Sequence, residues 1–243
     1  MPETPEETTN HELPTPTEEK PIESITITSD VIIPDYKPLN VPYSQWETER
    51  SQELLTANGF GTTPDEWRQA TQHSSGLIRS AAYYLLTRHP EQQDEDLFRR
   101  GLEDSDQTSQ NLAIYGLYRL GDSSAVPTLE KTAQLDVDAH TAATQAAGLL
   151  AEMGKPMAFA TIQQAMNSNL EYIRLFAIQN AMSFVPLHGQ IYAADKTIDI
   201  WDLYRQALQD ENIQVRSVAN LQLQELDFPE AQALLQNYSK TSE

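Results

Sequence analysis

Three patterns of aspartate, histidine and glycine along the chain could carry chemistry. Asp104-Ser105-Asp106 begins like a calcium loop, but the glycine and closing glutamate of such a loop are missing. The five histidines share no ligand spacing, and the one His-Glu dipeptide, His11-Glu12, lies in a polar N-terminal stretch. Gly59-Phe60-Gly61 lacks the third glycine and the preceding strand of a dinucleotide site. We therefore expect no metal site, no cofactor and no catalytic residue, which favours a non-enzymatic role.

Charge and cysteine content exclude further classes. The chain has 36 acidic and 16 basic residues and no cysteine, with a formal net charge of −20. Disulfides, thiolate catalysis and cysteine-based zinc sites are therefore absent. A strongly negative field repels phosphate groups, so we expect neither nucleic-acid binding nor docking on an anionic membrane.

The sequence gives two indications of location. It contains no stretch of about 18 apolar residues, which a membrane-spanning helix needs. Its first residues, Met1-Pro2-Glu3-Thr4-Pro5, lack the basic and apolar regions of a signal peptide. The expected location is the cytoplasm.

Composition divides the chain into residues 1–44 and residues 45–243. Residues 1–24 are rich in proline, glutamate and threonine, which predicts a disordered acidic tail. Residues 25–44 carry β-branched Ile25, Ile27 and Val31 followed by several prolines, which predicts an extended arm. The arm either packs its apolar residues along its own domain or serves as a linear motif for another protein's sheet edge or groove.

A helical unit occurs five times in the second region. Its register is marked by Arg79, Gln110, Ala143, Arg174 and Arg216, at spacings of 31, 33, 31 and 42 residues by subtraction. Helix pairs that recur at this length are typical of an α-solenoid, in which each unit buries its apolar face against its neighbours. We therefore predict an all-α, right-handed α-solenoid of about five helix pairs.

Caps and stop signals place the helices. A first helix is predicted from Ser44 to Ala57, ended by Asn58-Gly59. Thr63-Pro64-Asp65-Glu66 reads as a capping box with proline at the first helical position. The predicted pairs are 64–88, 94–120, 124–153, 156–184 and 198–226, followed by a capping helix at 229–238.

Two segments resemble HEAT repeats. The run from Leu120 to Leu129, LGDSSAVPTL, is similar to an inter-repeat segment, and the run from Glu211 to Ala219, ENIQVRSVA, is similar to a turn and second helix. The short repeat resembles the HEAT-like subclass named after phycobiliprotein lyases and extends over residues 64–238. The resemblance implies that Arg79, Arg174 and Arg216 bond acidic turn residues of neighbouring units. Gln110 and Ala143 interrupt this arginine series.

The resemblance also implies that the second helices line a concave face. Tyr84 and Tyr115 occupy the same repeat position, beside the apolar stripe of their helices. Aromatic side chains on such a face are typical anchors for a partner protein, because they offer large contact area at low entropic cost. The alternative is that the rings fill the space between units. The predicted partner-binding tyrosines are Tyr83, Tyr84, Tyr115 and Tyr118.

An insertion lengthens the fourth unit by about ten residues, at 185–196. Insertions in repeat proteins gather on one rim, often the functional one. This one is predicted to be a loop that either supplements the binding face or folds back onto its own repeat. Its predicted partner-binding residues are Leu187, His188, Ile191 and Tyr192.

These features favour a protein-interaction scaffold or adaptor that holds a partner on the concave face. The acidic charge favours a basic partner, mainly by speeding encounter. Two other functions stay open. The resemblance allows a bilin lyase subunit or chromophore-handling chaperone, and the fold would also suit an inhibitor of the immunity-protein type.

Overall fold

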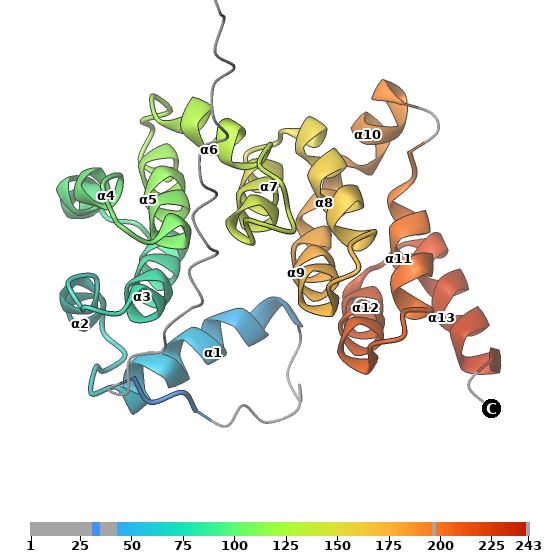
Figure 1. The fold of residues 1–243 in the computed structure, drawn as a ribbon, viewed down its shortest axis with the longest axis horizontal. Coiled ribbons are helices and arrows are strands. Elements are labelled where there is room, and N and C mark those ends of the chain that lie inside the picture. The colour runs from blue at the N-terminus through green and yellow to red at the C-terminus, as the bar shows by residue number, and fades with distance from the viewer. Residues whose placement is uncertain (1–30, 35–42, 196–197, 242–243) are drawn as a thin grey trace, which may run out of the picture.

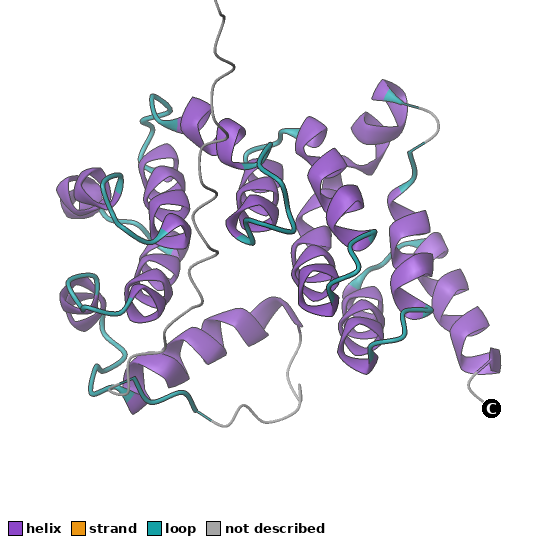
Figure 2. Cartoon of the chain, in the orientation of Figure 1, coloured by secondary structure: helices purple, strands orange, loops and turns teal. Residues whose placement is uncertain are grey.

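A computed structural model describes residues 31–34, 43–195 and 198–241. The residues in these ranges form helices joined by turns, with no strand (Figure 2). The predicted all-α class is confirmed. The predicted tail and most of the predicted arm lie outside the described residues.

The helices follow the predicted order closely. They are α1 (Tyr43–Ala57), α2 (Pro64–Ala70), α3 (Gly76–Arg88), α4 (Glu95–Gly101), α5 (Gln107–Arg119), α6 (Val126–Thr132), α7 (Ala142–Glu152), α8 (Phe159–Met166), α9 (Glu171–Ala181), α10 (His188–Ala194), α11 (Ile200–Leu208), α12 (Ile213–Glu225) and α13 (Pro229–Thr241). Short 3-10 segments lie at Gln92–Asp94, Pro156–Ala158 and Met182–Leu187.

Two layers of helices account for most of the packing (Figure 1). In the inner layer α3, α5, α7, α9 and α12 contact one another in that order. In the outer layer α2, α4, α6, α8 and α11 each pack against the inner helix that follows them in the chain. Every predicted helix pair is present as such a neighbouring pair.

Local chemistry explains where the helices begin and end. Thr63 and Glu66 form the predicted capping box at α2, and the Asp106 carboxylate caps α5 by accepting from the Ser109 N–H at 2.8 Å. Gly121 and Gly154 follow α5 and α7 with φ of 96° and 77°, a backbone region that is strained for other residues. These residues fix where α2 and α5 begin and where α5 and α7 end.

Charged turns tie successive units together. Arg79 donates to the Asp104 carboxylate of the next unit at 2.5 and 2.8 Å, and Arg174 donates to Asp210 at 2.7 and 3.1 Å. The expected bonds between neighbouring units are thus present at both positions. Gln110, which replaces the arginine, donates instead to the Asp104 carbonyl of its own turn. Arg216 likewise binds carbonyls of its own turn, at Asp210 and Glu211.

The insertion is helical, so the prediction of a loop at 185–194 is wrong. Met182–Leu187 continues α9 as a 3-10 helix, and α10 follows directly. Pro186 and Gly189 suggest a loop, but Phe184, Leu187 and Ile191 are buried at helical spacing. The free energy gained by burying these three side chains outweighs the tendency of the proline and the glycine to interrupt a helix.

Helix α1 lies across the inner layer. It contacts α3 near its C-terminal end and α12 near its N-terminal end, so it bridges the row from one side to the other (Figure 1). Leu54 and Leu55 are its buried anchors, and the next turn ends it at Gly59, with φ of 86°. The inner face of the second helices is therefore partly covered by the chain's own first helix.

A close approach between α4 and α5 gives a test of the packing. A Cβ added to Gly116 would lie 2.4 Å from the fully buried ring of Phe98, whereas one added to Gly189 in α10 meets nothing within 4 Å. We expect Gly116→Ala to lower the free energy of unfolding by about 1–3 kcal/mol through overpacking. Gly189→Ala should raise it by about 0.5–1 kcal/mol, because alanine favours the helix. Urea denaturation followed by circular dichroism measures both, and equal shifts for the two variants would contradict the packing described.

Candidate functional site

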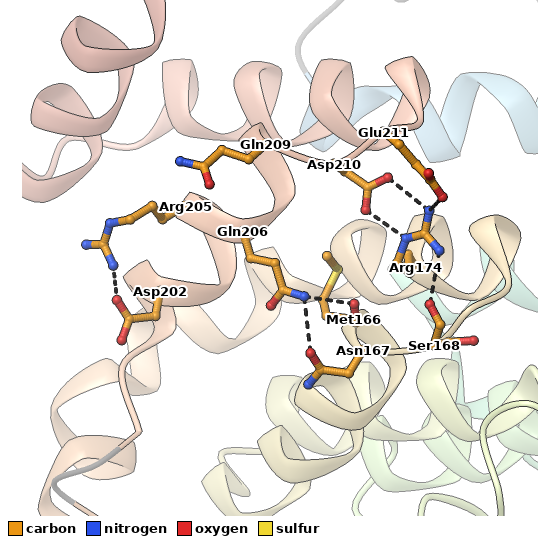
Figure 3. Close-up of a pocket in the computed structure, with 10 residues that line it drawn as sticks. All are labelled: Met166, Asn167, Ser168, Arg174, Asp202, Arg205, Gln206, Gln209, Asp210 and Glu211. Carbon is orange, nitrogen blue, oxygen red and sulfur yellow. Dashed lines mark hydrogen bonds and ion pairs between the residues drawn. The ribbon is translucent and has the colours of Figure 1, made fainter. Parts of the chain in front are cut away.

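The polar groups that line a hollow near the start of α9 are used in contacts between helical units (Figure 3). It has a volume of about 650 Å³ and is lined by turn residues around Arg174. All three guanidinium nitrogens of Arg174 are used, by the Asp210 and Glu211 carboxylates and by the Ser168 carbonyl at 3.0 Å. The Gln206 amide donates to the Met166 carbonyl at 3.0 Å and thereby joins α11 to the end of α8. These groups hold two units together.

A second cavity lies on the opposite face and is the stronger candidate. It has a volume of about 300 Å³. Its wall is formed by Ile33, by α1 from Trp46 to Leu54, and by inward side chains of α3, α5, α7 and α9. We call it the inner groove. Helix α1 forms one side of it, because α1 bridges the row of second helices.

The inner layer contributes to the groove at equivalent positions of successive repeats. Two residues before the Arg79 register position stand Leu77, Thr108 and Thr141, and two residues after it stand Leu112, Gln145 and Phe176 in the second, third and fourth units. Leu77 and Phe176 are exposed to 44% and 39%, which is high for large apolar side chains. The wall therefore combines apolar groups with hydroxyl and amide groups.

The C-terminal ends of α3, α5 and α7 make the charged end of the groove region. The Arg88 guanidinium lies 4.4 Å above the Tyr84 ring and 3.5 Å from the Glu152 carboxylate. The Tyr115 hydroxyl donates to the same carboxylate at 2.5 Å. The Arg119 guanidinium lies 5.9 Å from the Tyr115 ring. These contacts link three consecutive units by alternating cations, rings and a carboxylate.

Glu47 of α1 faces this charged end. Desolvation by the surrounding protein raises the pKa of the Glu47 carboxyl, while the charge of Arg88 opposes this rise and that of Glu152 adds to it. Burial also raises the pKa of Tyr84, whose hydroxyl lies 3.5 Å from the Thr48 hydroxyl.

The predicted tyrosines divide between two sides of the inner layer. Tyr83 is buried toward the outer layer, with its ring 6.2 Å from that of Phe98, and burial raises its pKa to about 12. Tyr84 lines the inner groove, and Tyr115 is bonded to the groove-side Glu152, but both are buried as well. Tyr118 is half-buried and stacks on Tyr115 with a centroid distance of 6.4 Å. Three of the four rings thus serve packing between helices.

The predicted residues of the insertion lie apart from the groove. In Figure 1, α10 lies at the upper right, on the far side of α8 and α9 from α1. Leu187 and Ile191 are buried, and His188 is half-buried with its ring 5.7 Å from that of Trp201. Tyr192 is exposed. The structure does not bring the tyrosines and the insertion together in one patch.

Several groove residues were not predicted. Trp46 and Phe176 line it from opposite sides, and Gln145 and Asn180 add side-chain amides. The repeat register would have found those on α7 and α9, because equivalent positions of a repeat face the same side. Trp46 carries no such signal, since α1 is not part of a repeat.

Within residues 31–34, 43–195 and 198–241, no group of three or more histidine, aspartate or glutamate side chains is arranged to hold a metal ion. None of the helices placed there has both the length and the apolar character needed to cross a membrane. In comparison with known proteins, no family and no curated protein matches this chain.

Proposed function

We propose that this protein is a non-enzymatic interaction scaffold that holds a segment of a partner protein in the inner groove. The observation that carries the proposal is a wall of apolar, hydroxyl and amide side chains supplied by α1 and four successive second helices. Such a mixture suits a polypeptide, whose backbone needs hydrogen bonds and whose side chains need apolar contact.

The arrangement of helices supports a HEAT-like architecture for the scaffold. Consecutive second helices contact one another in order, and Arg79 and Arg174 bond acidic turns of the following unit. In our proposal the five pairs form a short right-handed α-solenoid. Helix α1 and Ile33 then lie on its concave side and narrow the surface on which a partner binds.

Charge supports a basic partner. The residues after position 44 carry a net charge of −13, which is −20 for the chain minus −7 for residues 1–44. A field of this sign attracts positive proteins and speeds encounter, an effect that salt weakens. Association should therefore slow as ionic strength rises, with a smaller change in dissociation.

Two exposed groove residues provide the test. We expect Leu77→Ser/Phe176→Ser to weaken partner binding at least about tenfold, because both side chains are apolar anchors within the groove. Affinity capture from cells followed by mass spectrometry identifies the partner, and titration with that purified protein measures the affinity.

The matched control removes two exposed apolar residues elsewhere. Leu135→Ser/Met157→Ser changes the same kind of side chain outside the groove, and it should leave the affinity within about twofold of wild type. Equal affinities for wild type and the groove variant, with folding intact, would disprove the proposed function.

A further inference from the structure

A strap of four residues, 31–34, is bonded to the C-terminal end of α1 through one side chain (Figure 1). The Asn58 amide donates to the Ile32 carbonyl at 2.6 Å and to the Leu54 carbonyl at 2.8 Å. Its oxygen accepts from the Ile32 N–H at 2.8 Å. Both hydrogens and the oxygen of this side chain are therefore used. Only an amide offers two donors and an acceptor on one such planar group.

The neighbours of Ile32 anchor the strap from either side. Val31 packs against the core, and Ile33 lines the inner groove. The Ile32 side chain is 60% exposed, so this residue contributes mainly through its backbone. The strap is thus held by the amide of Asn58 and by the side chains at positions 31 and 33.

The residue that holds the strap also has a reactive neighbour. Asn58 is the only asparagine of the chain that is followed by glycine. The nitrogen of a following glycine can attack the asparagine Cγ with little hindrance, because glycine has no side chain. Gly59 is exposed, and a Cβ added to it would meet no atom within 4 Å. Water therefore has access to this pair, as deamidation requires.

Deamidation consumes one water and releases ammonia. The Gly59 nitrogen gives its proton to hydroxide and forms a bond to Cγ of Asn58. The Cγ–Nδ2 bond then breaks, and the leaving group takes a proton from water to become ammonia. Water opens the resulting five-membered imide by breaking one of the two carbonyl bonds to the Gly59 nitrogen, to which a proton returns. The product is aspartate or isoaspartate, according to which bond breaks.

We propose that Asn58 is a site of spontaneous deamidation that the bound strap protects, and that its product releases the strap. The inference concerns a covalent modification and does not depend on a partner. Ring closure requires the Asn58 side chain to turn toward the Gly59 nitrogen, so its three hydrogen bonds must break first. Two of them go to Ile32. The reaction is therefore slow while the strap is bound and faster once the strap has opened.

The backbone adds to this protection. The Gly59 N–H donates to the Thr56 carbonyl at 3.1 Å, and the Asn58 N–H donates to the Leu55 carbonyl at 3.1 Å. The attacking nitrogen is thus part of the hydrogen-bonded turn that ends α1. Protection by the turn stays when the strap opens, so the strap accounts only for the part that its own two bonds contribute.

The product cannot hold the strap. In aspartate an oxygen replaces Nδ2, so two donors are lost and a carboxylate faces the carbonyls of Ile32 and Leu54. The new charge also lies at the C-terminal end of α1, where the helix dipole disfavours an anion. Release of the strap withdraws Ile33 from the wall of the inner groove. Deamidation of Asn58 is thus an irreversible change to one wall of the groove.

Peptide mapping by mass spectrometry tests the protection. Val31→Ser/Ile33→Ser removes both anchors of the strap and should deamidate at Asn58 at least about tenfold faster than the wild-type chain at mildly alkaline pH. Ile32→Ser is the matched control, because the replaced side chain is exposed and its backbone bonds remain. It should deamidate within about twofold of wild type. Every rate should rise with pH, since the Gly59 nitrogen must lose its proton.

Amide hydrogen exchange followed by NMR tests the release. Asn58→Asp reproduces the aspartate product, and the Ile32 N–H should exchange at least about tenfold faster in this variant than in wild type. Asn167→Asp makes the same chemical change in the turn after α8, away from the strap. It should leave the exchange rate of the Ile32 N–H within about twofold of wild type.

Three results would overturn the proposal. The first is an equal deamidation rate in Val31→Ser/Ile33→Ser and Ile32→Ser, and the second is no deamidation at Asn58 in either variant. The third is unchanged exchange of the Ile32 N–H in Asn58→Asp. Circular dichroism checks folding, because the strap lies outside the helices and its release should leave helix content unchanged.

Discussion

Replacing Arg174 with alanine is expected to lower the free energy of unfolding by about 3–5 kcal/mol. The side chains of Arg174 and Asp210 are only 9% and 5% exposed, and they are joined by two hydrogen bonds. Removal of one partner of a buried pair leaves the other charge without compensation, and this effect dominates the loss. Urea denaturation at pH 7, followed by circular dichroism, measures the change.

The control lies in the same hollow (Figure 3). Arg205 pairs with Asp202, but these side chains are 52% and 62% exposed. Exposed pairs contribute about 0–1 kcal/mol because water screens the charges and the side chains lose entropy. Arg205→Ala should therefore leave stability nearly unchanged. Similar losses for the two variants would contradict a structural role of the Arg174 pair.

The pH dependence separates lost charge pairing from lost packing. Burial alone would raise the pKa of the Asp210 carboxyl, but hydrogen bonds from Arg174 and from the Asn212 N–H outweigh it and lower the pKa. A lowered folded-state pKa stabilises the fold above the unfolded pKa, and this contribution is lost as pH falls through the folded value. The difference between wild type and Arg174→Ala should thus be largest near pH 7 and shrink below about pH 4.

Phe98→Ala is expected to lower the free energy of unfolding by about 3–5 kcal/mol. The ring is fully buried between α4 and α5, beside Tyr83 and over the bare backbone of Gly116. Alanine would lose the transfer free energy of the ring and leave a cavity that the short helix α4 cannot easily fill. Thermal and urea denaturation both report the change.

Phe176→Ala makes the same chemical change on the groove wall. Because that ring is 39% exposed, the stability loss should be only about 1 kcal/mol. The two variants should rank in the reverse order for partner affinity. Phe176→Ala should bind the partner more weakly than wild type, whereas folded Phe98→Ala should bind it with unchanged affinity. A Phe176→Ala variant as unstable as Phe98→Ala would show that the ring serves the core and not the groove.

Much of the fold could be predicted from local signals. Thr63, Asp106 and Gly121 act within a few residues of themselves, so the boundaries of α2 and α5 could be read directly. The repeating apolar stripe likewise determined which helices form pairs, because each unit buries its apolar face against its neighbours. The bonds of Arg79 and Arg174 follow from their place in that repeat.

The all-helical class, the helix pairs and the turns between units could thus be predicted from local and repeating patterns. The residues that line the inner groove could not, because they depend on how the helices pack. Adjacent residues of a helix point about 100° apart, so Tyr83 and Tyr84 face different layers, and the placement of α1 decides what covers Tyr84. The position of α1 depends on its contacts with α3 and α12. Because α12 begins 156 residues after α1 ends (213 − 57), no local pattern encodes that contact.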